Sequence, residues 1–167
     1  GLQEYVEFVV QGSPTCGGTN CMDLRGIIID DNNGAYATMT SGSGIAMGAI
    51  RFANDPFWSC VPYGTLITVY NDQDLNGQVP PNDFNDSDFT LVLPVSSVYF
   101  DGHATLPDAS NPAYPAAGWV NGSGQWTFIG MSNGNDSFQV IENGVVTSSV
   151  SWGNNSGPNI NFATGAT

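Results

Sequence analysis

The sequence predicts an all-β fold, an antiparallel sandwich of two sheets, and three observations support this prediction. Apolar residues alternate with polar ones or form short runs, which is the pattern of strands. Clusters of Gly, Asn, Asp and Pro separate these runs at short intervals and indicate turns. No stretch has the apolar spacing of an amphipathic helix, so helical crossovers between parallel strands are not expected.

A run of three isoleucines, residues 27–29, is the centre of the predicted fold. Three consecutive β-branched residues with no polar face indicate a strand that is covered on both sides. The run ends at Asp30, Asp31 and Asn32, whose side chains can hydrogen-bond to their own backbone in a turn. We therefore expect these isoleucines to lie between two layers of β-structure.

The other elements follow in chain order. The first strand, residues 2–11, places Leu2, Val6, Phe8 and Val10 on its inner face. Further strands are expected at residues 35–39, 45–52, 65–70, 89–93, 126–129, 137–141 and 145–152. Asn143 and Gly144 join the last two as a hairpin with a type I′ turn. Two irregular segments, an acidic loop at 71–88 and a Pro/Ala-rich excursion at 101–118, interrupt the series.

The length of 167 residues predicts one domain. A chain of this size buries about 70% of its unfolded surface, so one core is sufficient. We assign residues 1–153 to the sandwich and residues 154–167 to an Asn/Gly-rich tail. The tail serves either as an edge strand at 159–162 or as a linker. Because the chain opens directly into a strand pattern, we expect a mature fragment or a module of a longer protein.

The charge balance excludes several partners. Fifteen acidic residues stand against two arginines and no lysine, so the net charge is -13. Binding to phosphate groups needs clustered cations, so neither nucleic acid nor an anionic membrane surface is expected as a partner. No apolar run approaches the length of about 18 residues that membrane insertion requires. Bound divalent cations and adaptation to salty surroundings remain two explanations of the acidic surplus.

The three cysteines indicate in which cellular compartment the protein is expected. Cys16 and Cys21 flank the flexible sequence Gly-Gly-Thr-Asn, and we expect a small disulfide between them. Such a bridge would indicate an oxidising environment outside the cytoplasm. Cys60 is interpreted as a buried thiol. A structural zinc site is not expected, because the chain has one histidine and its three cysteines show no CxxC pairing.

Residues 72–83 have the spacing of a calcium-binding loop. Asp72, Asp74 and Asn76 occupy positions one, three and five, Gly77 occupies the sixth position, and Asp83 occupies the twelfth. In such loops the first three residues curl their oxygens around one ion and the glycine makes the sharp turn. A solvated turn is the alternative, because an aspartate replaces the usual glutamate at position twelve and two prolines precede it.

Aromatic residues in loops suggest a second kind of site. Trp58, Tyr114 and Trp119 lie in expected loops, where aromatic faces can stack on sugars and neighbouring Asn and Asp can hydrogen-bond to them. The alternative is that these rings seal the core. Glycans are therefore candidate ligands.

Two features offer acid–base chemistry, but each has a simpler interpretation. Asp30 and Asp31 are adjacent carboxylates, which in a cleft can shift each other's pKa, but in a turn usually cap backbone amides. His103 is the sole histidine. No strained nucleophile turn accompanies it, so we expect a loop histidine packed against Pro107 or Tyr114 rather than a catalytic triad.

Four pieces of the chain carry a resemblance to a known family. They are the opening strand at 4–8, the Asp-Leu-Arg-Gly-Ile sequence at 23–27, the turn and strand at 45–48 and 65–70, and the Asn/Gly/Asp-rich strand at 133–140 with its hairpin at 143–146. Together they resemble the lamin-tail domain of secreted bacterial proteins, although Arg25 and Ile27 depart from its Asp-Leu-Ser-Gly-Trp signature. The resemblance implies an immunoglobulin-like β-sandwich without catalytic activity, used as an accessory module in long extracellular proteins.

We therefore expect a non-catalytic, exported module with a structural or adhesive role in a larger cell-surface or filament protein. Its expected partners are neighbouring modules or copies of the same protein, and Ca²⁺ is the one cofactor considered. Self-assembly through an unpaired strand at either terminus is one variant of this role. The alternative is a carbohydrate-binding module of a secreted hydrolase.

Overall fold

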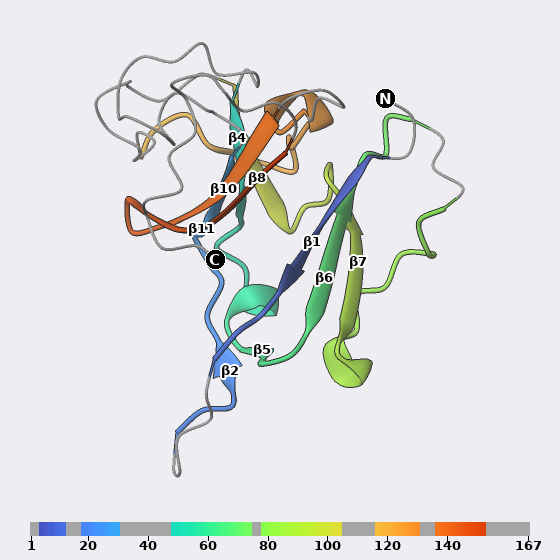
Figure 1. Cartoon of the computed structure of the whole chain (residues 1–167), viewed down its shortest axis with the longest axis vertical. Coiled ribbons are helices and arrows are strands. Elements are labelled where there is room, and N and C mark those ends of the chain that lie inside the picture. Colours follow the sequence, from blue (N-terminus) through green and yellow to red (C-terminus); the bar gives the residue numbers. More distant parts are fainter. Residues whose placement is uncertain are drawn as a thin grey trace.

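The computed structural model describes residues 4–12, 18–30, 48–74, 78–104, 116–130 and 136–152. Within these residues the chain forms an all-β sandwich, as predicted. A three-stranded sheet in the order β1-β6-β7 packs across the core from a six-stranded sheet in the order β11-β10-β3-β4-β8-β9 (Figure 1). No helix in the described ranges is long and apolar enough to cross a membrane.

The elements are short. The three-stranded sheet contains β1 (Tyr5–Val9), β6 (Leu66–Tyr70) and β7 (Thr90–Pro94). The six-stranded sheet contains β3 (Ile28–Asp30), β4 (Ala49–Phe52), β8 (Phe100–His103), β9 (Val120–Asn121), β10 (Asp136–Glu142) and β11 (Val145–Trp152). A separate pair consists of β2 (Cys21–Met22) and β5 (Val61–Pro62), and the described 3₁₀ helices are η1 (Pro56–Trp58), η2 (Asp86–Asp88) and η3 (Trp126–Phe128).

The isoleucine run lies inside the six-stranded sheet, but its expected coverage on both faces is confirmed only in part. β3 pairs with β10 on one side and with β4 on the other. Ile29 has no exposed surface and Ile27 is buried, so both belong to the core between the sheets. Ile28 lies on the opposite face and is half-buried.

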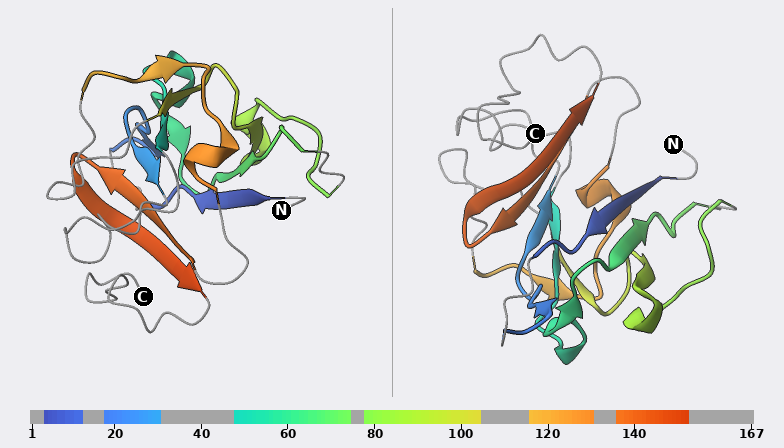
Figure 2. Two further views of the ribbon diagram at one scale, coloured as in Figure 1. Left: turned by 90° about the horizontal axis from the view of Figure 1, so that it is seen from above. Right: turned by 60° about the horizontal axis from the view of Figure 1, so that its bottom comes forward.

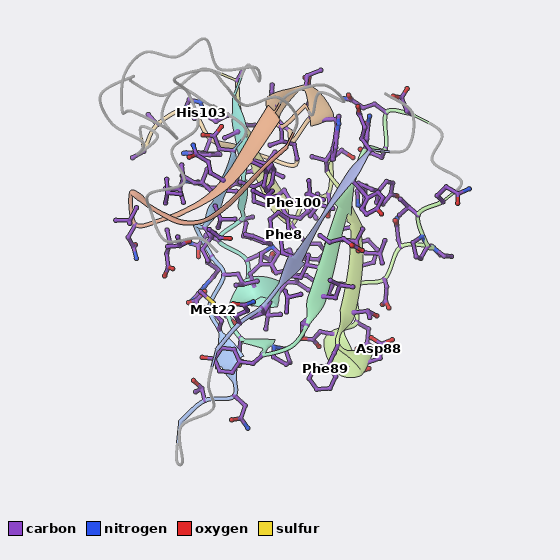
Figure 3. All side chains as sticks on the ribbon, in the orientation of Figure 1. Phe8, Met22, Asp88, Phe89, Phe100 and His103 are labelled. Carbon is purple, nitrogen blue, oxygen red and sulfur yellow. A yellow bond between two sulfur atoms is a disulfide. The ribbon has the colours of Figure 1, made fainter. Side chains whose placement is uncertain are left out.

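Alternating residues of β1 connect the two sheets. Val6 and Val10 point inward and are buried, whereas Tyr5 points outward and is 45% exposed. The Phe8 ring, labelled in Figure 3, lies 5.7 Å from the ring of Phe138 on β10, between centroids, and so bridges to the six-stranded sheet. The inner face predicted for the first strand is therefore confirmed.

The pairing of β6 with β7 differs from the antiparallel expectation. These strands run parallel, with Leu66 opposite Thr90 and Tyr70 opposite Pro94. A parallel pair needs a crossover connection of a dozen residues or more. Residues 71–89 are that crossover and include the acidic loop expected at 71–88, and η2 is the only helical turn among its described residues.

Three local expectations were wrong. Residues 101–103 belong to β8 rather than to an irregular excursion, and Gly102 permits this because a Cβ there would lie 2.6 Å from the carbonyl oxygen of Ser123. Residues 126–128 form η3 instead of a strand. Phe89, which was expected to begin the strand at 89–93, instead ends η2 with a positive φ of 65° and is 51% exposed.

The β10–β11 hairpin agrees with its turn signal. Asn143 and Gly144 connect the strands with φ angles of 51° and 75°, which is the left-handed pair that a type I′ turn requires. The expected strands at 35–39 and 159–162 lie outside the described residues.

Candidate functional site

The outer face of the three-stranded sheet carries a groove with a volume of about 660 Å³. Its floor comes from β1, β6 and β7, with Tyr5, Glu7, Leu66, Thr68, Thr90 and Val92 as the main lining side chains. Residues 78–83, which belong to the crossover before β7, form the wall of the groove. The volume lies within the range of about 300–1,000 Å³ that is usual for ligand sites. We call this feature the sheet groove.

Backbone pairing holds the crossover segment against the sheet. Asp83 and Val92 exchange two backbone hydrogen bonds of 3.0 and 2.9 Å, which add a short bridge to the edge of β7. The Tyr70 hydroxyl donates to the Asn82 side-chain oxygen at 2.7 Å. The groove is therefore built on hydrogen-bonded backbone on both its floor and its wall.

The tyrosine hydroxyl at this position remains a donor across the ordinary pH range. Burial raises the pKa of Tyr70, and the nearby carboxylate of Asp72 raises it further, although the bond to Asn82 acts in the opposite direction. A proton that is held more tightly keeps the bond to Asn82 intact when pH rises.

The charged groups of the sheet groove are all acidic. Glu7 and Asp83 contribute carboxylates to the lining, and none of its described residues is a cation. The two arginines of the chain lie elsewhere, Arg25 paired with Asp23 and Arg51 paired with Asp101. The groove therefore favours a ligand that donates hydrogen bonds, such as an ammonium, a guanidinium or a hydroxyl group.

The candidate calcium ligands have separate protein partners. Asp72 accepts a hydrogen bond from the Ser96 hydroxyl, and Asp74 accepts one of 3.3 Å from the Asn71 amide. Asp83 accepts one of 2.9 Å from a backbone N–H two residues along. In the described ranges, no three His, Cys, Asp or Glu side chains gather as a metal site would. Asn76 lies outside those ranges, so calcium binding by residues 72–83 stays a prediction.

The assignment of Trp58 to a ligand-stacking loop was wrong. Its side chain has no exposed surface, and its indole N–H donates to the carbonyl oxygen of Tyr99 at 2.6 Å. The ring packs edge-on against Phe52 at 4.7 Å between centroids. Asp55 caps η1 by accepting from the Phe57 N–H, and this turn directs Trp58 into the core. Tyr114 lies outside the described residues.

Trp119 is half-buried and belongs to a polar cluster on the outer face of the six-stranded sheet. The Arg51 guanidinium lies 4.4 Å from the centre of its ring, and Arg51 also donates to Asp101 at 2.8 Å. Asn121 donates to the other oxygen of Asp101 at 3.0 Å. Sequence reasoning missed this cluster, because its members come together only through the pairing of β4, β8 and β9.

The acid–base candidates are held inside the fold. Asp30 is fully buried and accepts a hydrogen bond of 2.9 Å from the Gln139 amide on the neighbouring strand. His103 lies on β8 rather than in a loop, is 3% exposed, and has its Nε2 3.1 Å from the carbonyl oxygen of Ala117. Asp31, Pro107 and Tyr114, their expected neighbours, lie outside the described residues.

The predicted disulfide was wrong in its pairing. Cys21 is bonded to Cys60, with their Cα atoms 5.0 Å apart. The pairing of β2 with β5 places Cys21 opposite Pro62 and so next to Cys60. Cys60 is therefore neither buried nor a thiol. Cys16 lies outside the described residues.

No protein-family model, curated protein or solved structure matches this chain. Membership of the lamin-tail family accordingly stays a prediction that depends on the sequence pieces themselves.

Proposed function

We propose that this chain is a non-catalytic, extracellular structural or adhesive module of a larger exported cell-surface or filament protein. The sheet groove is the observation that supports this proposal best. It offers a contact surface on three strands and a bridged crossover, and such backbone changes little when a partner binds. Its acidic lining selects partners that carry hydrogen-bond donors.

The placement of the acid–base candidates supports a role without catalysis. Asp30 is buried against Gln139, and His103 is buried on β8. A general acid or base must come within hydrogen-bond reach of a substrate atom, usually in an accessible cleft. The strongest titratable candidates of the sequence therefore contribute to packing and hydrogen bonding in this fold.

The disulfide and the acidic surface support an extracellular location. Disulfides persist mainly in oxidising compartments, and the Cys21–Cys60 bond links β2 to the residue that precedes β5. A net charge of -13 keeps such a chain soluble and attracts cations. We include Ca²⁺ at residues 72–83 in the proposal as a stiffening ion for the crossover.

Carbohydrate binding is the second candidate function, and the Trp119 cluster favours it. A half-buried indole beside a carboxylate and an amide, here Asp101 and Asn121, is a suitable combination for a sugar ring. This role would suit a binding module attached to a secreted hydrolase.

One binding experiment separates these functions. The full chain is applied to an array that presents neutral oligosaccharides and peptides containing Lys or Arg. We expect the chain to bind the peptides that contain Lys or Arg. This binding should become about tenfold weaker in Glu7→Gln, because a charge-assisted contact is lost. Glu142→Gln is the matched control, since Glu142 makes no part of the sheet groove.

The outcomes are distinct. Oligosaccharide binding that is lost in Trp119→Ala but unchanged in Glu7→Gln would favour the carbohydrate-binding module. Failure to bind any probe on either panel would contradict an adhesive role for the sheet groove.

A further inference from the structure

A second groove, with a volume of about 470 Å³, opens between β1 and the β10–β11 hairpin. Figure 2 shows β1 in blue and the β10–β11 hairpin in orange and red. The floor includes core residues such as Leu24, Ile27 and Phe52, whereas Glu7 and Glu142 lie among its polar lining. We call this feature the flank groove.

The core is incompletely covered at the flank groove. Phe8, Met22 and Val140 all line it, and all three are apolar side chains that remain partly exposed while packing on the buried core. Phe8 and Met22 are labelled in Figure 3. An apolar side chain that entered the groove would bury these three together, and burial of apolar surface is favourable.

The backbone edge of β1 borders the same groove. The Val10 N–H donates to Thr65 at 2.9 Å, and the Glu4 carbonyl accepts from Asn71 at 2.9 Å, so even-numbered residues bond to β6. Alternate residues of a strand direct their N–H and C=O groups to opposite edges. Those of Tyr5, Glu7 and Val9 therefore point away from β6, and within the described residues β1 pairs with β6 alone.

We propose that the flank groove is a strand-docking site and that its occupant is the segment 159–162 of the same chain. This segment reads Asn-Ile-Asn-Phe, so a strand there presents Ile160 and Phe162 to one face and two asparagines to the other. Paired with the open edge of β1, it would place both apolar side chains over Phe8 and Val140. The inference does not depend on the proposed function.

Charge and chain length both agree with this occupant. Residues 153–167 contain no charged side chain, so the segment meets the carboxylates of Glu7 and Glu142 without repulsion. Residues 153–158 can span about 20 Å when extended. Returning alongside β11 from Trp152 to Ser148, which lines the groove, takes about 14 Å.

Residues 153–158 connect the segment 159–162 to β11 of the same molecule, which makes that molecule the favoured donor of the strand. A short flexible linker gives an effective concentration in the millimolar range. A second copy would instead have to bring another net charge of -13 close to this one.

Amide hydrogen exchange measured residue by residue tests this assignment. The full chain is compared with a chain that ends at residue 156. We expect the amides of Tyr5, Glu7 and Val9 to exchange at least about tenfold faster in the shortened chain. The amides of Val6 and Phe8, which bond to β6, are the internal reference and should change much less.

Substitutions provide matched controls for the deletion. Phe162→Asp should reproduce the faster exchange, whereas Asn161→Asp adds the same charge to the opposite face of the strand and should leave exchange nearly unchanged.

Three results would overturn the assignment. The first is equal exchange of the odd-numbered amides in both chains. The second is uniform acceleration of odd and even amides, which would indicate a general loss of stability. The third is protection that appears only with a dimer in ultracentrifugation, which would assign the groove to the tail of a second copy.

Discussion

Asp23 and Arg25 show how neighbouring residues set a pKa in an exposed turn. Arg25 donates to Asp23 through its side chain, with Nε 2.8 Å from Oδ1, and through its backbone N–H at 3.1 Å. The side-chain bond is the larger cause, and together they lower the pKa of Asp23 from 3.8 to about 2. The turn leads through Gly26, with a positive φ of 82°, into the isoleucine strand.

This depressed pKa predicts a pH dependence of known sign. A carboxyl whose pKa is lower in the folded state stabilises the fold above its unfolded value of 3.8, and that contribution is lost as pH falls toward about 2. In Arg25→Gln the pKa of Asp23 should rise toward 3.8, although the backbone N–H remains as a donor. An NMR titration of the Asp23 carboxyl measures this. Arg51→Gln is the control, and an unchanged pKa of about 2 in Arg25→Gln would contradict the explanation.

Whole elements differ in how much of their conformation is local. The β10–β11 hairpin was predicted in detail, because Asn143 and Gly144 meet the requirement for positive φ within two residues. The crossover at 71–89 was predicted as a loop, but its role in joining two parallel strands was not. Local sequence specifies a turn, whereas the direction of a neighbouring strand depends on the pairing of distant residues.

The same crossover contains the candidate calcium ligands, and this can be tested by stability. Extracellular calcium modules bind with Kd values of about 10⁻⁴ to 10⁻³ M. We therefore expect about 10 mM Ca²⁺ to raise the free energy of unfolding by about 2 kcal/mol. Asp74→Asn should abolish most of this increase, and Glu142→Gln should retain it. Denaturant unfolding with and without Ca²⁺ measures the effect, and identical curves for the unsubstituted chain would remove calcium from the proposal.

At the scale of the whole molecule, the Cys21–Cys60 bond closes a loop with a sequence separation of 39. The loop includes β3 and β4 of one sheet and η1 with its buried Trp58. A cross-link over this distance restricts the unfolded chain far more than a bridge between Cys16 and Cys21 would.

The Cys21–Cys60 and Cys16–Cys21 pairings predict different losses of stability when a cysteine is replaced. Cys60→Ser should lower the free energy of unfolding by about 3–4 kcal/mol under oxidising conditions. Cys16→Ser should leave it nearly unchanged. Chemical denaturation of both variants measures the difference, and an equal loss in Cys16→Ser would support the shorter bridge instead.

Site prediction from the sequence succeeded less well than fold prediction. Trp58 was expected in a ligand-binding loop, yet Asp55 and Pro56 before it form the helical cap that turns it inward. The sheet groove had only a weak signal, the outward alternation of Tyr5 and Glu7. Its third strand and its wall come from residues about 70 to 85 positions later, so no local pattern could indicate it.

The sequence by itself determined the all-β class, the inner face of β1, the isoleucine strand and the I′ hairpin. Each of these depends on side-chain alternation or on backbone preferences within a few residues. The tertiary structure alone decided the parallel pairing of β6 with β7, the partner of Cys21, the burial of Trp58 and the two grooves beside β1. These features arise from contacts between segments far apart in the chain, where free energy depends on which surfaces meet rather than on local composition.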